Sequence, residues 1–213
     1  MRGIHVVRQR VRTDVAGEDT AYGGNFMEIT TKRLLIRRFM PEDGKDLWAY
    51  LSREDVVRYE PYNVYDEAAS NAEAARRSGD PAFLAVCLRE TGQLIGNLYF
   101  SRHEPEAFGT WEIGYVFHPN FGGMGYATEA ARAMISYGFA KMGVRRIVAE
   151  CNTENTSSWL LLERLGMRRE GHFRKVAYFK TNEDGTPRWF DAYAYAILAD
   201  EAESLVQLSR IAE

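Results

Sequence analysis

The spacing of apolar side chains along the chain predicts four helices. In the longest of them, apolar residues recur every three or four positions, so that they share one face. The second is polar and alanine-rich, with Asp66 as its expected N-cap and Gly79 as its stop signal. The predicted helices span 41–51, 66–77, 125–142 and 155–166.

Segments rich in apolar and β-branched residues predict seven strands. They span 34–39, 82–89, 93–100, 109–117, 145–151, 173–180 and 189–198. Three of them follow one another through short links, which indicates an antiparallel meander, and the last two are expected to pair across the loop 181–187. The element order predicts an α/β domain of the α+β kind, with a mixed, mostly antiparallel sheet flanked by helices.

The two ends of the chain read differently from this domain. Residues 1–26 hold few large apolar side chains and are turn-rich, so they are expected to be a flexible extension or to precede the true start at Met27. The domain is expected over 27–200, and 201–213 is expected to be a C-terminal tail.

Composition and charge narrow the function classes. A hydrophobic share of 46% is that of an ordinary soluble protein, and a net charge of −3 argues against a general nucleic-acid binder. No apolar run is long enough to span a membrane, and the start lacks a signal peptide, so a cytoplasmic protein is expected. Cys87 and Cys151 are expected to be buried as small apolar residues. The four histidines have no metal-ligand spacing, and no metal is expected.

A glycine cluster stands directly before the longest predicted helix. Gly122, Gly123 and Gly125 would let an anion approach the unpaired N–H groups of the first helical turn. The cluster is not a P-loop, because Tyr126 follows where Lys is required, and it is not a dinucleotide motif, because Thr128 takes the place of the third glycine. Taken alone, it is either a phosphate cradle or a tight turn.

The wider sequence resembles one enzyme family. The segment "GGMGYATEA", 122–130, is similar to the acetyl-CoA motif of the GNAT N-acetyltransferases, Gln/Arg-x-x-Gly-x-Gly/Ala. The segments "NTENTSSWLLLERLGMRREG", 152–171, and "TTKRLLIRRFMPEDGKDL", 30–47, resemble the second cofactor segment and the opening of the RimJ/RimL-like branch. The resemblance spans about 27–198.

The resemblance implies a GNAT fold in which the fourth and fifth predicted strands, 109–117 and 145–151, splay apart. The first of these strands is expected to carry a bulge near Gly114. Acetyl-CoA is the implied cosubstrate. By the same resemblance, its binding residues are Val116, Phe117, Gly122, Gly123, Met124, Gly125, Tyr126, Ala127, Thr128, Asn155 and Ser158. The amides near Val116 and Phe117 would polarise the acetyl carbonyl.

Three positions depart from the family pattern. Gly122 stands where Gln or Arg is usual, and Met167 replaces a Phe of similar volume. Leu162 stands where many members carry a tyrosine that protonates the leaving thiolate, so the general acid stays open. Asn155 and Ser158 also suit a helix N-cap, which is the competing interpretation of that motif.

The implied chemistry is direct acetyl transfer to an amine. Glu112 is the candidate base, because it lies on the strand that leads to the glycines and its apolar neighbours would raise its pKa; an ion-paired or solvent-facing Glu112 is the alternative. Ser158 is the candidate acid. The acceptor is first expected to be a protein N-terminal α-amine of the ribosomal-protein type. Polyamines, aminoglycosides or a non-catalytic acyl-CoA-binding role are the alternatives, and a homodimer is one option.

Aromatic and acidic residues supply candidates for the acceptor site. Each of them has an ordinary alternative role, in the core or on the surface. They are Tyr59, Tyr62, Tyr65, Trp111, Tyr178, Trp189, Glu54, Asp55 and Glu60.

Overall fold

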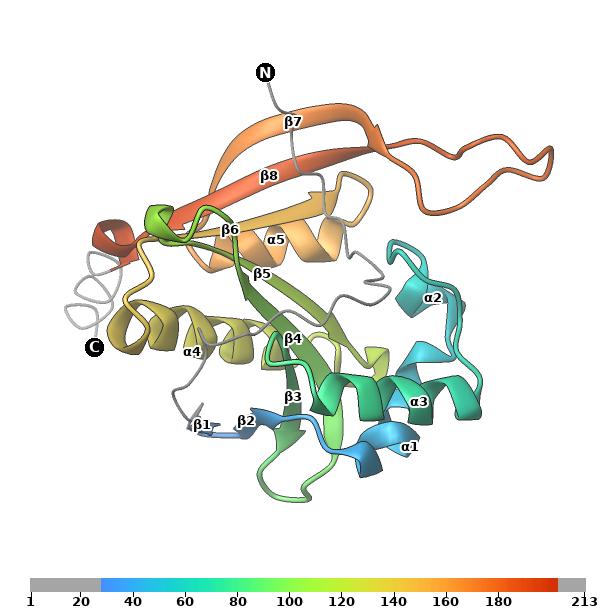
Figure 1. Cartoon of the computed structure of the whole chain (residues 1–213), viewed down its shortest axis with the longest axis horizontal. Helices are drawn as coiled ribbons and strands as arrows, with labels where there is room; N and C mark the ends of the chain where they lie inside the picture. Colours follow the sequence, from blue (N-terminus) through green and yellow to red (C-terminus); the bar gives the residue numbers. More distant parts are fainter. Residues whose placement is uncertain (1–27, 203–213) are drawn as a thin grey trace.

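One eight-stranded sheet runs through the part of the chain that the structure, a computed structural model, describes, namely residues 28–202 (Figure 1). Its strand order is β1-β2-β3-β4-β5-β6-β8-β7. The strands are β1 (Ile29–Thr30), β2 (Leu34–Arg38), β3 (Phe83–Leu88), β4 (Leu94–Arg102), β5 (Thr110–Phe117), β6 (Arg146–Asn152), β7 (Arg168–Ala177) and β8 (Phe190–Leu198). The expectations for 1–26 and for 203–213 lie outside the described residues.

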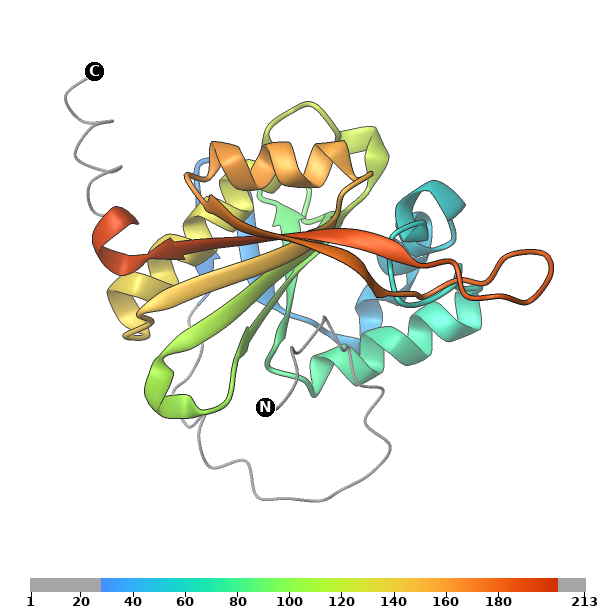
Figure 2. The same cartoon turned by 90° about the horizontal axis from the view of Figure 1, so that it is seen from above.

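Helices cover both faces of this sheet. α4 and α5 pack on one face, and α1, α2 and α3 lie on the other (Figure 2). The helices are α1 (Gly44–Leu51), α2 (Glu54–Val57), α3 (Glu67–Ser78), α4 (Tyr126–Lys141) and α5 (Thr156–Arg164), with short 3-10 turns η1 (Pro41–Asp43), η2 (Glu106–Phe108) and η3 (Pro119–Phe121). Among residues 28–202, no helix is both long and apolar enough to cross a membrane.

The predicted elements are present, with three differences. Asp66 caps α3 by accepting a hydrogen bond from the amide of Ala69 at 2.7 Å, as expected. β1 and α2 were not predicted, because elements of two and four residues are too short to show a period. β7 was expected over 173–180 but begins at Arg168. Its first residues are exposed and mostly charged, so they show no apolar strand pattern, and they form a strand because they pair with β8.

The meander and the final hairpin are confirmed. β2 through β5 pair antiparallel in sequence order, and β8 pairs antiparallel with both β6 and β7. The interior is divided by the sheet into two apolar clusters. Cys87 and Cys151 are buried, one in each cluster, as expected, and burial raises the pKa of both thiols to about 11.

β5 and β6 form a short parallel pair and then part. The pairing joins Thr110–Glu112 to Arg146–Val148, after which β5 continues to Phe117 and β6 to Asn152 without pairing with each other (Figure 1). This confirms the expected splay. The expected bulge is absent from the β4–β5 pairing, which is regular from Phe117 to Trp111, with Gly114 opposite Tyr99.

Candidate active site

A cleft of about 490 Å³ lies where β5 and β6 part. It gathers residues from both faces of the sheet. The expected site residues that line it are Glu112, Val116, Phe117, Gly122, Gly123, Ala127, Asn155 and Ser158. An adjoining hollow at the start of α4 is lined by Gly122, Gly123, Gly125, Tyr126, Ala127 and Thr128. Met124 lines neither and is exposed, although its backbone carbonyl accepts a hydrogen bond from Arg33.

The glycines are required by the backbone itself. Gly123 and Gly125 have φ values of +73° and +80°, in the left-handed region that favours glycine, and Gly125 is the N-cap of α4. A Cβ at Gly122 would lie 2.9 Å from the carbonyl oxygen of Pro119. The glycines therefore make a tight turn that also leaves the first N–H groups of α4 facing the hollow. Such a bare, electropositive helix start fits a phosphate group.

Arginines missed by the sequence analysis surround this hollow. Arg33 donates from Nη1 to the carbonyl of Met124 at 2.9 Å and from Nε to Glu129 at 2.7 Å, and its guanidinium lies 4.3 Å from the ring centre of Tyr126. No local pattern predicts a contact across 91 residues of sequence. Arg132 and Arg164 also line the hollow. Arg132 follows Thr128 by one helical turn, so its position on the same face was predictable.

The backbone of β5 presents alternate residues to the open edge. The amide of His118 donates to the carbonyl of Ile95, and the amide of His103 donates to the carbonyl of Thr110, both at 2.8 Å. These two bonds show which residues of β5 exchange backbone hydrogen bonds with β4. Even-numbered residues of β5 therefore bond to β4. Tyr115 and Phe117 direct their backbone groups toward the β6 side instead, in the stretch where β5 and β6 no longer pair with each other.

Glu112 stands at the fork between the strands. It is the last β5 residue that pairs with β6, opposite Val148, and its side chain is 19% exposed. Its Oε2 lies 3.0 Å from Nε2 of His103. This hydrogen bond raises the pKa of His103 by favouring the charged imidazole, and the nearby charge of Glu150 acts in the same direction. Glu112 is therefore both a cleft residue and half of a polar pair, rather than a carboxylate among apolar groups alone.

Asn155 and Ser158 meet β5 from the other side of the cleft. Asn155 caps α5, because its Oδ1 accepts from the amide of Ser158 at 3.2 Å, so the N-cap interpretation is confirmed. The Ser158 hydroxyl lies 3.0 Å from the phenol of Tyr115, and burial raises the pKa of that phenol above its ordinary value. Leu162 is fully buried in the wall.

The comparison with known families decides the identity. A model of the acetyltransferase (GNAT) domain matches residues 33–168, which is more than half of the chain. The chain belongs to the GNAT acetyltransferase family. A relative in Bacillus subtilis, the uncharacterized N-acetyltransferase YnaD, is 43% identical over 176 residues, covering 82% of this chain and 99% of that protein. This GNAT protein is accordingly an N-acetyltransferase.

Solved structures agree with the fold of this acetyltransferase. A GNAT-family acetyltransferase of Bacillus anthracis is 38% identical with a TM-score of 0.74, over 82% of this chain and 99% of that one. The ribosomal-protein-S5-alanine acetyltransferase of Vibrio fischeri has a TM-score of 0.67 at 18% identity, over 82% of this chain and 97% of that one. At that identity, the likeness concerns the fold alone.

The acceptor-site candidates of the acetyltransferase separate into two groups. Tyr59, Tyr62, Asp55 and Glu60 line the cleft. The others lie elsewhere: Trp111 stacks on Phe100 in the core, Tyr178 packs against Trp189 with both rings exposed, Tyr65 packs against Tyr62, and Glu54 begins α2. Within the described 28–202, no group of three or more His, Cys, Asp or Glu side chains is placed to hold a metal ion.

Proposed function

We propose that this acetyltransferase takes its acetyl group from acetyl-CoA and transfers it directly to a primary amine. The observation that carries the proposal is the splay of β5 and β6 beside the glycine loop, with Glu112 at the fork. A strand edge with unpaired N–H and C=O groups suits the amides of a pantetheine arm. The adjoining helix start and its arginines suit phosphate groups.

Backbone groups carry most of the proposed binding. The first amides of α4, after Gly123 and Gly125, would hold the pyrophosphate. The amide of Phe117, which faces the open edge, would hold the acetyl end and polarise its carbonyl. Val116 also lines the cleft, but its amide bonds to β4 and is therefore not free for the cosubstrate. The sequence analysis assigned polarisation of the acetyl carbonyl to the amides near both Val116 and Phe117, and the proposal gives it to Phe117 alone.

The proposed chemistry needs a base and an acid. Acetyl-CoA supplies a thioester whose C–S bond breaks as the acceptor nitrogen bonds to the acetyl carbon. An amine is mostly protonated near neutral pH, so the proton that it loses must be accepted, and Glu112, which lines the cleft, is our candidate base. The hydroxyl of Ser158, hydrogen-bonded to Tyr115, is our candidate donor to the leaving sulfur.

The kind of amine that accepts the acetyl group is a further part of the proposal. The named activity of the Vibrio fischeri protein makes a protein N-terminal α-amine the first acceptor to test. A small amine is the alternative, and the acidic residues Asp55, Glu60 and Glu150 in the cleft support an ammonium group of either origin. The cytoplasmic location and the homodimer stay predictions.

The deciding experiment is isothermal titration of the protein with acetyl-CoA, with NAD⁺ as the control ligand. Saturable binding of acetyl-CoA alone is expected, followed by release of free CoA thiol when amines are added. Absence of acetyl-CoA binding would overturn the proposal and would reduce the glycine loop to a tight turn. Binding without CoA release by any amine would overturn the catalytic part.

A further inference from the structure

A buried arginine forms part of the cleft wall on the α1–α3 side of the sheet. Arg77 belongs to the last turn of α3, lines the cleft and is 1% exposed. Its guanidinium carbon lies 4.7 Å from the ring centre of Phe83 and 5.4 Å from that of Phe39. These cation–π contacts stabilise a guanidinium that is almost fully buried, which is rare for arginine.

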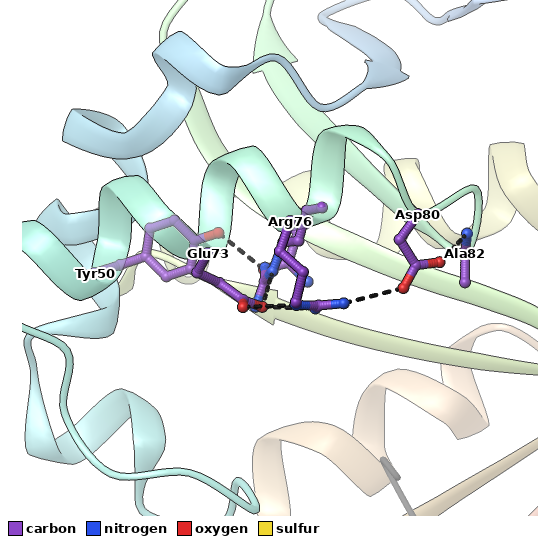
Figure 3. Close-up of polar contacts among 7 residues, drawn as sticks. Tyr50, Glu73, Arg76, Asp80 and Ala82 are labelled. Atoms are coloured by element: carbon purple, nitrogen blue, oxygen red, sulfur yellow. Dashed lines mark hydrogen bonds and ion pairs between the residues drawn. The ribbon is translucent and has the colours of Figure 1, made fainter. Parts of the chain in front are cut away.

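Only part of this guanidinium is satisfied. Arg77 donates from Nε to Glu73 at 2.7 Å, and its guanidinium also hydrogen-bonds to the phenol of Tyr50. Glu73 also binds Arg76, which reaches on to Asp80 at the surface (Figure 3). Nη1 of Arg77 is buried and makes no hydrogen bond to any residue within 28–202. Buried charged donors are nearly always paired, because an unpaired one loses its water without replacement. Nη1 is therefore a donor that suits a ligand oxygen.

The other charged groups of the cleft are acidic except for Arg164, which also lines the hollow at the start of α4. Asp55 and Glu60 line it from α2 and the segment that follows, and Glu112 and Glu150 line it from β5 and β6. Desolvation raises the pKa of Glu60 to about 7, and the charge of Arg77 opposes that rise. The cleft thus offers carboxylates to an ammonium group and, on its α1–α3 side, the cationic donor Arg77 to an oxygen. A polyamine would place only ammonium groups beside Arg77.

We propose that the acceptor is an amine that also carries a carboxylate, as a free amino acid does, and that Arg77 binds this carboxylate through Nη1 while the amine faces Glu112. Because Nε of Arg77 is engaged by Glu73, Nη1 is the donor left for one oxygen of the carboxylate, and such a charge-assisted hydrogen bond is stronger than a neutral one. The inference rests on the proposed function, since the amine must meet an acetyl donor. It narrows the acceptor class from any primary amine to amines that carry a carboxylate, and it ranks free amino acids ahead of peptide N-termini.

The first test compares acceptors that differ by one group. The panel is the common amino acids, the amines that they give on loss of the carboxylate (phenethylamine, tryptamine, cadaverine), tripeptides with the same first residues, and spermidine. Release of CoA thiol is measured with saturating acetyl-CoA. We expect kcat/KM to be at least about tenfold higher for an amino acid than for its matched amine, the scale of one charged hydrogen bond. Equal or higher values for the amines, the peptides or spermidine would overturn the inference.

The second test removes the guanidinium. Arg77→Met should raise KM for the preferred amino acid at least about tenfold and abolish its advantage over the matched amine, with the affinity for acetyl-CoA unchanged. Arg77→Lys keeps the charge and should lose most of the same preference. Arg76→Met is the matched control, because Arg76 also binds Glu73 but lies outside the cleft wall, and it should keep the preference.

The outcomes separate the inference from the proposed function. Acetylation of amines without a carboxylate preference, or a preference that survives Arg77→Met, overturns the inference and leaves the proposed function standing. Absence of acetyl-CoA binding by the wild-type protein overturns both. If Arg77→Met does not fold, the comparison of matched acceptors on the wild-type protein decides the inference by itself.

Discussion

His103 and Glu112 form a hydrogen-bonded pair, with Nε2 and Oε2 3.0 Å apart, at the point where β5 leaves β6. His103 lies in the connection that precedes β5, and its side chain is 38% exposed while that of Glu112 is 19% exposed. The pair therefore links the proposed base in the cleft to a group that reaches solvent. If Glu112 is the base, this arrangement would give a proton taken from the acceptor a route out of the cleft.

Replacing Glu112 by Gln should lower kcat/KM by about 10²–10³, the range expected when a general base is lost. The affinity for acetyl-CoA, measured by titration, should change by less than about twofold, since the backbone rather than this side chain is proposed to bind it. Glu150→Gln is the control, because it removes a carboxylate from the same cleft on β6 and should cost much less. Equal losses in the two variants would show that the charge of the cleft matters rather than proton removal.

The stability contributed by His103 should depend on pH. Its pKa is raised in the folded protein, because the hydrogen bond to Glu112 favours the charged form. The gain is therefore fully present below the unfolded pKa of about 6.5 and is lost as the pH rises through the folded value. Solvent screening of this partly exposed pair keeps it below about 1 kcal/mol. The melting temperature of His103→Gln should thus fall below wild type at pH 5 by no more than about 2–4 °C. A difference that grows toward pH 8 would contradict this assignment.

Replacing Gly123 by Ala should weaken acetyl-CoA binding more than it weakens the fold. The left-handed φ of +73° costs an alanine about 1–2 kcal/mol. Among residues 28–202, no atom apart from those of its chain neighbours lies within 4 Å of the added Cβ, so any further loss of affinity reports on a ligand at the loop. Loss of one charged hydrogen bond, about 1.5–3 kcal/mol, would lower the affinity by about tenfold or more.

Gly92 supplies a matched control for this glycine. It has a φ of +74°, and its added Cβ likewise meets no atom within 4 Å in the described part of the chain beyond its chain neighbours, but it lies in the turn between β3 and β4. Gly92→Ala should therefore lower the melting temperature by a similar amount and leave acetyl-CoA binding unchanged. Equal losses of affinity in both variants would mean that the loop does not contact the cosubstrate.

The pair Tyr115 and Ser158 should reveal the proton donor to the leaving sulfur. Ser158→Ala is expected to lower kcat by about tenfold or more, with little change in the affinity for acetyl-CoA. Tyr115→Phe keeps the serine hydroxyl and removes only its partner at 3.0 Å, so a severalfold loss is expected. A larger loss in Tyr115→Phe would assign the donor to the phenol, and wild-type rates in both would exclude the pair. Both variants are to be followed by CoA release under single-turnover conditions.

The sequence by itself determined the elements whose side chains follow a clear period, and it determined the glycine loop. The apolar face of α4, the cap at Asp66 and the antiparallel meander all follow from short-range rules. The glycines could be predicted because a positive φ is a property of one residue and its neighbours. The resemblance then implied the splay between β5 and β6, which the short parallel pairing confirms.

Only the tertiary structure decided which side chains meet. The tether from Arg33 to the glycine loop, the pairing of His103 with Glu112 and the unpaired donor of Arg77 join residues from different elements. Strand register decided that Phe117, rather than Val116, turns its amide to the open edge. Register and burial depend on how the whole sheet assembles, and a one-residue shift in pairing would exchange the groups that face the cleft. A local pattern carries no such information, and the charged partners in this site are therefore visible only in the folded chain.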